Sequence, residues 1–504
     1  MKKIVLILCL AIVFSCLASC SSSEPQDSNQ SDTQITSSET DKSEESNVEN
    51  IFSLPYFSKD SLNPYSAKQS VNFYMGSLLY EPLFQLENSF NPVGVIAEKY
   101  EMQGSKCIVT IKRGLKFSDG SDITANDVTA SFKTAKNSSY YSQRLANANS
   151  CTAKGNTVTF NLKSTDANFV CNLNFPIIKG GSNKTLAIGS GRYKFSETTP
   201  LSLVKNELNT RNSSKINSIS LVEIHKYSVL PYMVKIGSVN YVYATQDFDL
   251  KTAALKTTPV LTNNLLYLGI NSDNIYLANQ DVRKAVSLLI NRKAILTDAF
   301  ANGGYASASP FHPMNTKLNS KDYTIDLTNA AAAAELLNVA GLTKDKNGKL
   351  VDVQSLAVTL RLCVNKSNTA RVRAAQSMKL SLEAAGFTIE ILECSDEEYR
   401  ASVSSGNFDL FIGEVKLTPD NDISPLLSKG NLNMCDDGGE TLTAYNNYRS
   451  EQIELNDFLR TFDLKTPFIP IMYKNGTVVS SGTLSGNVAV TEYDIFADMD
   501  KWVF

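Results

Sequence analysis

The stretch VTIKRGLKFSDGSDITANDVTASF, residues 109–132, carries in turn the signals of a strand, a turn and a helix. Apolar and polar residues alternate through its first part, as they do in a half-buried strand. Asp119 and Gly120 favour a turn, and Thr124 is a suitable N-cap with Asp127 three residues later. Three apolar residues then share one face of the helix: Val128, Phe132 and Ala135. The stretch predicts a strand–turn–helix unit whose polar residues serve the architecture.

The rest of the chain alternates between the same kinds of element. Residues 157–163 alternate like residues 107–117, so the two strands are expected to pair. Helical patterns are found in residues 281–300 (one helix or a close pair), 329–342 and the first part of 371–393. Gly341 and Gly386 are expected to end the last two helices. Helix, glycine and strand in this order predict an α/β fold.

Two short strands are expected near the C-terminus, at residues 467–473 and 477–481. Between them stands Asn475-Gly476, a pair that favours a tight turn.

The N-terminus has the features of an export signal. Lys2 and Lys3 precede an apolar run that ends at Leu17 and is shorter than the roughly 20 residues needed to span a bilayer. Leu17-Ala18-Ser19-Cys20 resembles the bacterial lipoprotein signal, in which the chain is cut before an acylated cysteine. We therefore expect a signal peptide at residues 1–19 and a lipid on Cys20. An ordinary signal peptide cut nearby is the alternative.

Residues 20–50 form a tether in this interpretation. After Cys20 the segment holds eight acidic residues, one lysine and no aromatic residue, so it cannot bury enough apolar surface to fold. The tether carries about −7 of the chain's net charge of −3, so residues 51–504 are within a few charges of neutrality. A nearly neutral body is not expected to bind nucleic acid. About 450 residues exceed what one core usually supports, so more than one domain is expected.

Metal, cofactor and catalytic sites are not expected. Six cysteines follow Cys20, widely spaced and without a C-x-x-C motif, and we interpret them as small buried residues. A single disulfide between Cys151 and Cys171 is the alternative. The chain has only two histidines, His225 and His312, which disfavours nickel or haem binding. Neither Gly-x-Ser-x-Gly nor His-Glu-x-x-His occurs, so an enzyme is not expected.

Several segments, in order, resemble the family 5 extracellular solute-binding proteins, the receptors of bacterial oligopeptide, dipeptide and nickel ABC importers. They are LLYEPLFQLENSFNPVGVIAEKYE (residues 78–101), the stretch quoted at the outset, IGSGRYKF (188–195) and LYLGINSDNIYLANQDVRKAVSLLINRKAI (266–295). Ser190 and Arg192 stand where the family has threonine and proline.

The resemblance implies an α/β, two-lobed periplasmic-binding-protein-like fold of type II, the large peptide-binding class, with a hinge and an interlobe cleft. The implied boundaries are 51–269 for the first part of lobe I, 270–465 for lobe II and 466–504 for the return of the chain to lobe I. Such a protein binds its solute between the lobes, and the solute favours the closed state through contacts with both.

The resemblance also suggests ligand-binding residues. Tyr80, Glu81 and Tyr473 lie in segments that match the family near the lobe boundary, and Asn271 lies where the chain crosses between lobes, as a hinge or a ligand contact. In the loop at residues 412–427, peptide binders carry a tryptophan and then an acidic anchor for the ligand's amino group. Glu414 and Leu417 occupy those two positions here, so Glu414, Asp420 or Asp422 is the expected replacement anchor.

The expected function is that of a lipid-anchored, extracytoplasmic receptor of an ABC importer, with short peptides as the leading cargo. Its partners would be the solute, the permease and, through the lipid, the outer face of the cytoplasmic membrane, and the protein would be a monomer. Two alternatives stay open: a sensor of peptide signals, and a receptor for another solute such as chelated nickel, haem or an oligosaccharide.

Overall fold

The structure, a computed structural model, describes residues 51–182, 184–244, 255–319, 322–430, 432–486 and 488–504. The expected signal peptide, Cys20 and the tether lie outside these ranges. Within them, no helix is both long and apolar enough to cross a membrane.

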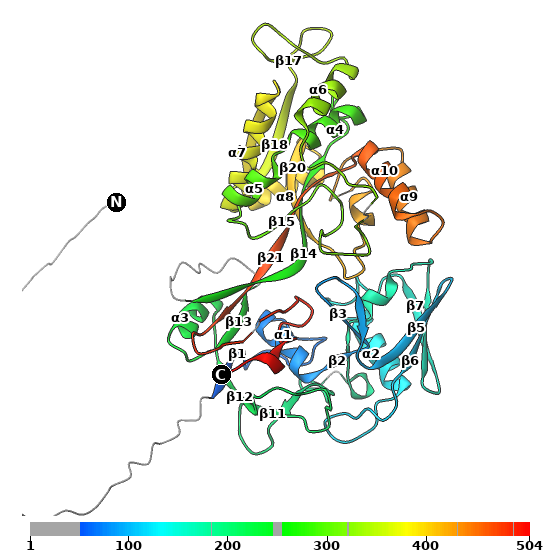
Figure 1. Cartoon of the computed structure of the whole chain (residues 1–504), viewed down its shortest axis with the longest axis vertical. Coiled ribbons are helices and arrows are strands. Elements are labelled where there is room, and N and C mark those ends of the chain that lie inside the picture. Colours follow the sequence, from blue (N-terminus) through cyan, green and yellow to red (C-terminus); the bar gives the residue numbers. More distant parts are fainter. Residues whose placement is uncertain (1–50, 183, 245–254, 320–321, 431, 487) are drawn as a thin grey trace, which may run out of the picture. The chain divides into compact units, whose positions relative to one another are not determined.

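Two long antiparallel strands, β14 (Lys256–Ile270) and β21 (Ile469–Ser480), connect the parts of the fold. They belong to a seven-stranded sheet ordered β13-β21-β14-β20-β18-β19, in which β15 also pairs with β21. The first part of β14 pairs with the last part of β21, beside β13 (Tyr241–Ala244). From Asn264 onward β14 also pairs with β20 (Leu410–Lys416). Figure 1 shows both strands running from β13 to the neighbourhood of β18 and β20.

The tight turn expected at Asn475-Gly476 is wrong. Both residues continue β21, opposite Leu261 and Val260 of β14. The reason is tertiary: β14 supplies a strand partner on both sides of the pair, and Tyr243 covers Gly476 so closely that a Cβ there would lie 2.5 Å from the Tyr243 hydroxyl and 2.7 Å from its ring. Here glycine permits the close approach of a ring.

The terminal region, which we define as the part packed around the core of residues 52–260 and 478–502, contains two four-stranded sheets and two small strand pairs. One sheet has the order β5-β6-β8-β7, and its strands are Ala97–Gln103, Lys106–Ile111, Thr157–Leu162 and Ala148–Lys154. The other has the order β1-β12-β11-β10, with strands Phe52–Tyr56, Ser218–Glu223, Ser202–Lys205 and Tyr193–Phe195. The strand pairs are β2 (Glu81–Pro82) with β9 (Pro176–Ile177), and β3 (Phe84–Leu86) with β4 (Pro92–Gly94). The helices are α1 (Ser70–Leu79), α2 (Ala125–Lys136) and α3 (Leu230–Lys235).

The strand–turn–helix unit expected from residues 109–132 is present. Strand β6 pairs antiparallel with β8, as the alternation predicted, although it ends at Ile111. Helix α2 begins after Thr124 with a capping box in which Asp127 Oδ2 accepts from the Thr124 backbone N–H (2.9 Å). The C-terminal segment also packs into this region, where Trp502 is fully buried and its ring lies 4.6 Å from that of Tyr241.

The middle region, with cores built from residues 265–473, contains the remaining elements. Its helices are α4 (Gln280–Leu289), α5 (Arg292–Asp298), α6 (Ala330–Val339), α7 (Thr369–Ala384), α8 (Asp396–Ser405), α9 (Glu440–Arg449) and α10 (Leu455–Lys465). Its further strands are β15 (Gly304–Ala306), β16 (Thr343–Lys344), β17 (Leu350–Val351), β18 (Thr359–Asn365) and β19 (Thr388–Cys394). The expected helical pair is α4 with α5, and both glycine stops adopt a positive φ, +79° at Gly341 and +106° at Gly386.

The six cysteines after Cys20 are free thiols in the structure, so Cys151 and Cys171 are not joined. Four of the six are buried, which fits the role of small apolar residues, while Cys151 and Cys394 are half-buried.

Candidate functional site

A cavity of about 540 Å³ is lined by two segments that are far apart in the sequence. One segment, within residues 143–172, belongs to the terminal region, and the other, within residues 415–450, belongs to the middle region. We call this space the cleft cavity. Its size suits a small-molecule ligand, and six of its lining residues are charged: Arg144, Asp166, Lys416, Asp420, Asp422 and Arg449.

Arg449 joins the two segments through Asp166 and also binds Asp420 of its own segment. Its Nε donates to Asp166 Oδ1 (2.9 Å) and its Nη2 to Asp420 Oδ2 (2.6 Å). Burial raises the pKa of Asp166, although the Arg449 charge opposes that change. Burial alone would lower the pKa of Arg449, but Tyr445, Asp420 and Asp166 raise it. This triad of two ionisable acids and one guanidinium has one more potential negative charge than positive.

Two acceptor oxygens of the lining residues have no hydrogen-bond partner among the described residues. They are Asp420 Oδ1 and Asn172 Oδ1, and both side chains are at least nine-tenths buried. A buried acceptor without a donor is costly, so such sites favour a group that can donate.

Lys416 is already paired with an acid. Its Nζ lies 2.5 Å from Glu492 Oε2, and Glu492 Oε1 accepts from the backbone N–H of Asn263 (2.8 Å). Burial would lower the pKa of Lys416, but Glu492 raises it above its usual range. The positive charge of Lys416 is therefore balanced by the negative charge of Glu492, and the pair contributes no net charge to the cleft cavity.

Arg144 has a different environment. Its guanidinium carbon lies 4.6 Å from the centre of the Tyr140 ring and 5.2 Å from that of Tyr141, and its Nη1 donates to Asn174 Oδ1 (3.2 Å). Among the described residues no carboxylate lies within 4.0 Å of it. Asp422, on the other segment, likewise has no ion pair there and accepts from the backbone N–H of Ser424 (2.9 Å).

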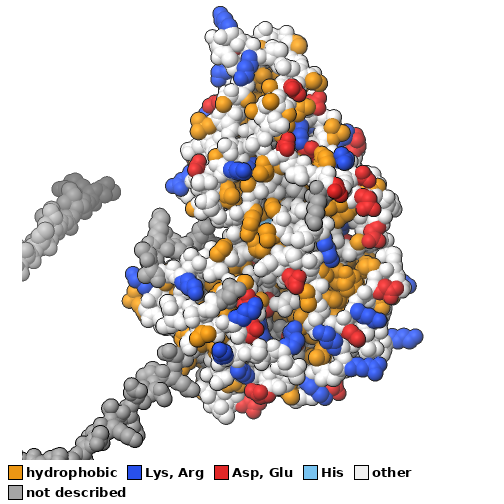
Figure 2. Space-filling model, in the orientation of Figure 1, with side chains coloured by type: hydrophobic (Ala, Val, Ile, Leu, Met, Phe, Trp, Pro, Cys, Tyr) orange, Lys and Arg blue, Asp and Glu red, His pale blue; other side chains and the backbone are white. Residues whose placement is uncertain are grey.

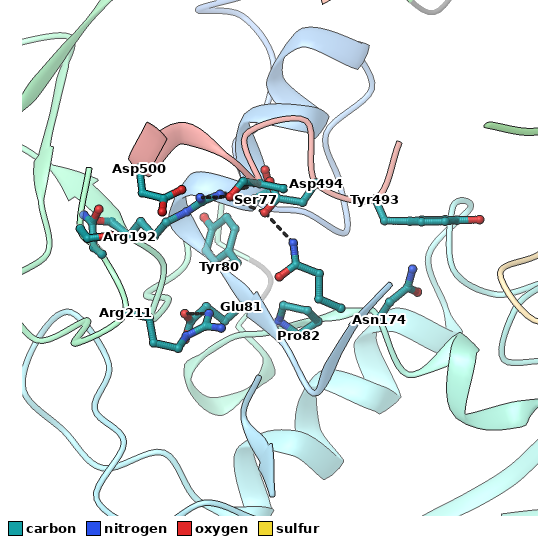
Figure 3. A pocket seen from close by; sticks show the side chains of 14 residues that line it. Ser77, Tyr80, Glu81, Pro82, Asn174, Arg192, Arg211, Tyr493, Asp494 and Asp500 are labelled. Carbon is teal, nitrogen blue, oxygen red and sulfur yellow. Dashed lines mark hydrogen bonds and ion pairs between the residues drawn. The ribbon is translucent and has the colours of Figure 1, made fainter. Parts of the chain in front are cut away.

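A second cavity, of about 190 Å³, lies within the terminal region and contains two of the residues expected in the site, Tyr80 and Glu81 (Figure 3). Glu81 is enclosed by its own partners: Arg211 pairs with Oε1, Asn209 donates to Oε1 (2.8 Å), and Ser190 donates to Oε2 (3.1 Å). Tyr80 is buried, and burial raises the pKa of its hydroxyl.

The same cavity contains an ion pair at its other side. Arg192 Nη2 lies 2.9 Å from Asp494 Oδ2, to which Gln85 also donates (2.7 Å; Figure 3). Arg192, which replaces the family's proline, thus ties β10 to the C-terminal segment. The charges of this cavity largely satisfy one another.

A third cavity, of about 60 Å³, shares lining residues with both of the others. It has Tyr80 and Tyr493 in common with the second cavity and Arg144 in common with the cleft cavity. The buried Tyr493 hydroxyl has no hydrogen-bond partner, and burial raises its pKa. Arg144 therefore stands where the cleft cavity meets the smaller cavities of the terminal region.

Of the residues expected in the site from the sequence, Leu417 and Asp420 line the cleft cavity. Leu417 is buried in an apolar core, and its backbone N–H donates to Asn263 O (2.9 Å). At the position where the family has its acidic anchor, this chain therefore has a core side chain. The preceding residue, Lys416, also lines the cavity, but its charge is paired with Glu492.

Glu414 lies beside two cations and lines none of the three cavities. Its Oε2 accepts from Arg371 Nη2 (2.7 Å) and Lys474 Nζ (3.2 Å). Burial acts to raise the pKa of Glu414, but the charges of Lys474 and Arg371 outweigh it and lower the pKa.

Asn271 and Tyr473 also line none of the three cavities. The Asn271 amide donates to Gly406 O (2.9 Å) and Phe408 O (3.1 Å), and so ties the end of β14 to the segment before β20. Tyr473 is fully buried and donates to Pro310 O (2.7 Å).

Sequence reasoning missed four of the six charged residues of the cleft cavity: Arg144, Asp166, Lys416 and Arg449. No local pattern distinguishes them, because their significance lies in pairings across as many as 283 residues.

Metal ligands do not gather in the part of the chain that the structure describes. No group of three or more His, Cys, Asp and Glu residues there could hold a metal ion. His225 is exposed, and His312 is buried among aromatic rings. The face shown in Figure 2 intersperses acidic and basic side chains, in line with the small net charge.

Comparisons with known proteins place this geometry in context. Residues 91–433 match the family model of the bacterial extracellular solute-binding proteins, family 5 Middle. The oligopeptide-binding protein AppA of Bacillus subtilis is 26% identical over 373 residues, which cover 67% of this chain and 68% of AppA. The glutathione-binding protein GsiB of Salmonella choleraesuis is 25% identical over 308 residues, or 56% of this chain and 59% of GsiB.

The fold is shared with solved structures. The structure of a nickel ABC transporter protein from Bacillus halodurans matches with a TM-score of 0.72 at 18% identity, covering 88% of this chain and 98% of that one.

Proposed function

This chain belongs to the bacterial extracellular solute-binding proteins of family 5, and from that premise we propose that it captures short peptides in the cleft cavity for delivery to the permease of an ABC importer. The observation that carries the proposal is the cleft cavity itself, which two separate segments line with residues of both charges. A short peptide has an ammonium and a carboxylate, as well as amide groups that bind polar residues. The relatives named for oligopeptide and glutathione binding support this class of cargo.

Lobe I would consist of residues 51–269 and 466–504, and lobe II of residues 270–465. The apolar cores support a division into two lobes, because the terminal region and the middle region each have cores of their own, although residues 265–268 and 468–473 pack in the cores of the middle region. Strands β14 and β21 pass between them, and the pairing of these strands shifts register between Leu261 and Asn264. We place the hinge at this irregularity, since a β-bulge bends a strand locally.

Solute capture would then follow from a shift of the equilibrium between the open and the closed state. A ligand that contacts Arg144 or Asp166 on one lobe and Lys416 or Asp420 on the other binds the closed state more tightly than the open one. The protein would act by binding alone, without catalysis, and as a monomer.

Chelated nickel is the second candidate cargo, because the solved structure from Bacillus halodurans that shares this fold is named for nickel transport. A chelate would have to bring most of its own ligands, since the described residues offer no metal site.

The N-terminal sequence is the basis for proposing a lipid anchor. Cys20 after Leu17-Ala18-Ser19 would be acylated and would hold the protein at the outer face of the cytoplasmic membrane, with residues 21–50 as a tether. We expect Cys20→Ala to release the protein or leave it unprocessed, because this is the lipidation site, and cell fractionation measures the result. Cys9→Ala, a change in the apolar run before the cleavage site, should leave the protein at the membrane. Full membrane retention of the Cys20 variant would contradict the anchor.

Binding tests the function directly. The Cys20→Ala chain would be titrated by calorimetry and thermal shift with peptides of two to eight residues, chelated nickel, haem and oligosaccharides. A ligand at 100 times its Kd adds about 2.7 kcal/mol to the free energy of unfolding. Binding of peptides but not of the other classes is the expected result, and binding of another class alone would overturn the peptide proposal.

A further inference from the structure

The cations of the cleft cavity differ in their partners. Arg449 lies between Asp166 and Asp420, and Lys416 is paired with Glu492. Among the described residues, no carboxylate comes within ion-pair distance of Arg144, the third cation of the lining. Within the described part of the chain, its one hydrogen bond to another side chain is that of Nη1 to the neutral amide of Asn174 (3.2 Å). The guanidinium therefore keeps most of its donor capacity for another group.

We propose that Arg144 binds the C-terminal carboxylate of the ligand, so that the receptor selects peptides with a free C-terminus. This inference rests on the proposed function and names the chemical group of the ligand that the cleft recognises. A guanidinium presents parallel N–H groups that match the two oxygens of a carboxylate, and it loses less water on binding than an ammonium does.

The surroundings of Arg144 prepare it for this task. The rings of Tyr140 and Tyr141 lie 4.6 and 5.2 Å from the guanidinium carbon, and Asn174 holds one of its nitrogens. Stacking on rings limits the motion of a long side chain, so less entropy is lost when a ligand binds. Its position in the linings of both the cleft cavity and the 60 Å³ cavity leaves space beside it for a ligand group.

The opposite segment supplies the complementary charge. Asp422 has no ion pair within the described residues, and the Asp166–Arg449–Asp420 triad has an excess of carboxylate with an unpartnered oxygen on Asp420. Among the described residues, the lining thus has a cation without an ion pair at Arg144 and, on the opposite segment, carboxylate oxygens without one at Asp422 and Asp420 Oδ1, an arrangement that matches a zwitterion. The carboxylate of a peptide would lie at Arg144 and its ammonium toward the acids of the other lobe.

The test compares ligands that differ only in the carboxylate. Trialanine and trialanine amide would be titrated by calorimetry into the Cys20→Ala chain and into the same chain with Arg144→Gln, Arg144→Lys or Arg113→Gln. Arg113 is an exposed residue of the terminal region that lines none of the three cavities, and so it controls for the loss of one positive charge. Thermal unfolding would show whether each variant is folded.

In the parent chain we expect the amide to bind about tenfold or more weakly than the acid, as for the loss of a charge-assisted pair. Arg144→Gln should weaken the acid by about the same factor and leave the amide nearly unchanged, so that the preference disappears. Arg144→Lys should keep part of it, and Arg113→Gln should keep all of it.

An unchanged preference for the acid in Arg144→Gln would overturn the inference, and so would equal binding of acid and amide in the parent chain. Either result leaves peptide binding intact. Failure of both peptides to bind the parent chain would instead remove the proposed function, and this inference with it. Should Arg144→Gln not fold, a reduced preference for the acid in Arg144→Lys would support the inference and full retention there would contradict it.

Discussion

His312 is a residue whose ionisation is decided by its surroundings. Its ring is fully buried and lies 4.7 Å from the ring of Tyr473 and 5.1 Å from that of Phe90, and its Nε2 has no hydrogen-bond partner. Burial lowers its pKa to about 4. The unfolded chain binds this proton as the pH falls through about 6.5, whereas the folded protein binds it only near pH 4.

The free energy of unfolding should therefore decrease as the pH is lowered across this interval, because the unfolded state binds more protons there. From pH 7 to pH 5 we expect His312 to account for a loss of about 2 kcal/mol in the free energy of unfolding. Denaturant titrations at the two pH values measure it. His312→Gln should abolish this part of the loss, and His225→Gln, at an exposed site, should retain it. Equal pH dependence in the two variants would rule out this account.

The candidate site residues also show what single positions reveal. Asp420 could be suggested from the loop at residues 412–427, and it lines the cleft cavity. Glu414 was an equally good candidate by sequence, but its charge is used by Arg371 and Lys474. Asp420 also has a cation beside it, Arg449, but it lies in the cavity lining, and where the fold places each acid is not contained in any local pattern.

Among the elements, helix α2 tests how far local signals carry. Asp127 Oδ2 accepts from the backbone N–H and the hydroxyl of Thr124 (2.9 and 2.6 Å), and its Oδ1 accepts from the backbone N–H of Gly180 (2.9 Å). Asp127→Ala removes the cap and the link to Gly180, so we expect a loss of about 1 to 2 kcal/mol in stability. Asn126→Ala, the exposed neighbour, should change it by less than about 0.5 kcal/mol. Chemical denaturation measures both, and equal effects would contradict the capping role.

Elements were predicted well where their signals are local. The Thr124 cap, the glycine stops at Gly341 and Gly386 and the alternation in β6 and β8 each act within a few residues. The turn at Asn475-Gly476 was predicted by the same logic and does not form. There the pairing with β14 and the ring of Tyr243 override the local preference.

Across the whole molecule, the Asp166–Arg449 pair is a contact between the two proposed lobes. Asp166→Asn should weaken it and favour the open state. We expect peptide affinity to fall about tenfold and the ligand-free protein to become more expanded, as measured by calorimetry and small-angle X-ray scattering. Asp122→Asn is the matched control, because its partner Lys116 lies on the surface of the same region. If the two variants bind and scatter alike, the pair does not control closure.

The amino-acid sequence by itself determined the family, the α/β type II fold and many of the helices and strands, because these depend on motifs and periodicities within short segments. Its N-terminal pattern also supports the proposed export signal and lipid site at Cys20. The tertiary structure decided which charges meet. Arg449 is neutralised by Asp166 from 283 positions away, Lys416 is paired with Glu492, and Arg144 keeps an unpaired guanidinium at the cleft. The reason is physical: the energy of a charge depends on the distance and burial of its partners, and folding sets both across the whole chain.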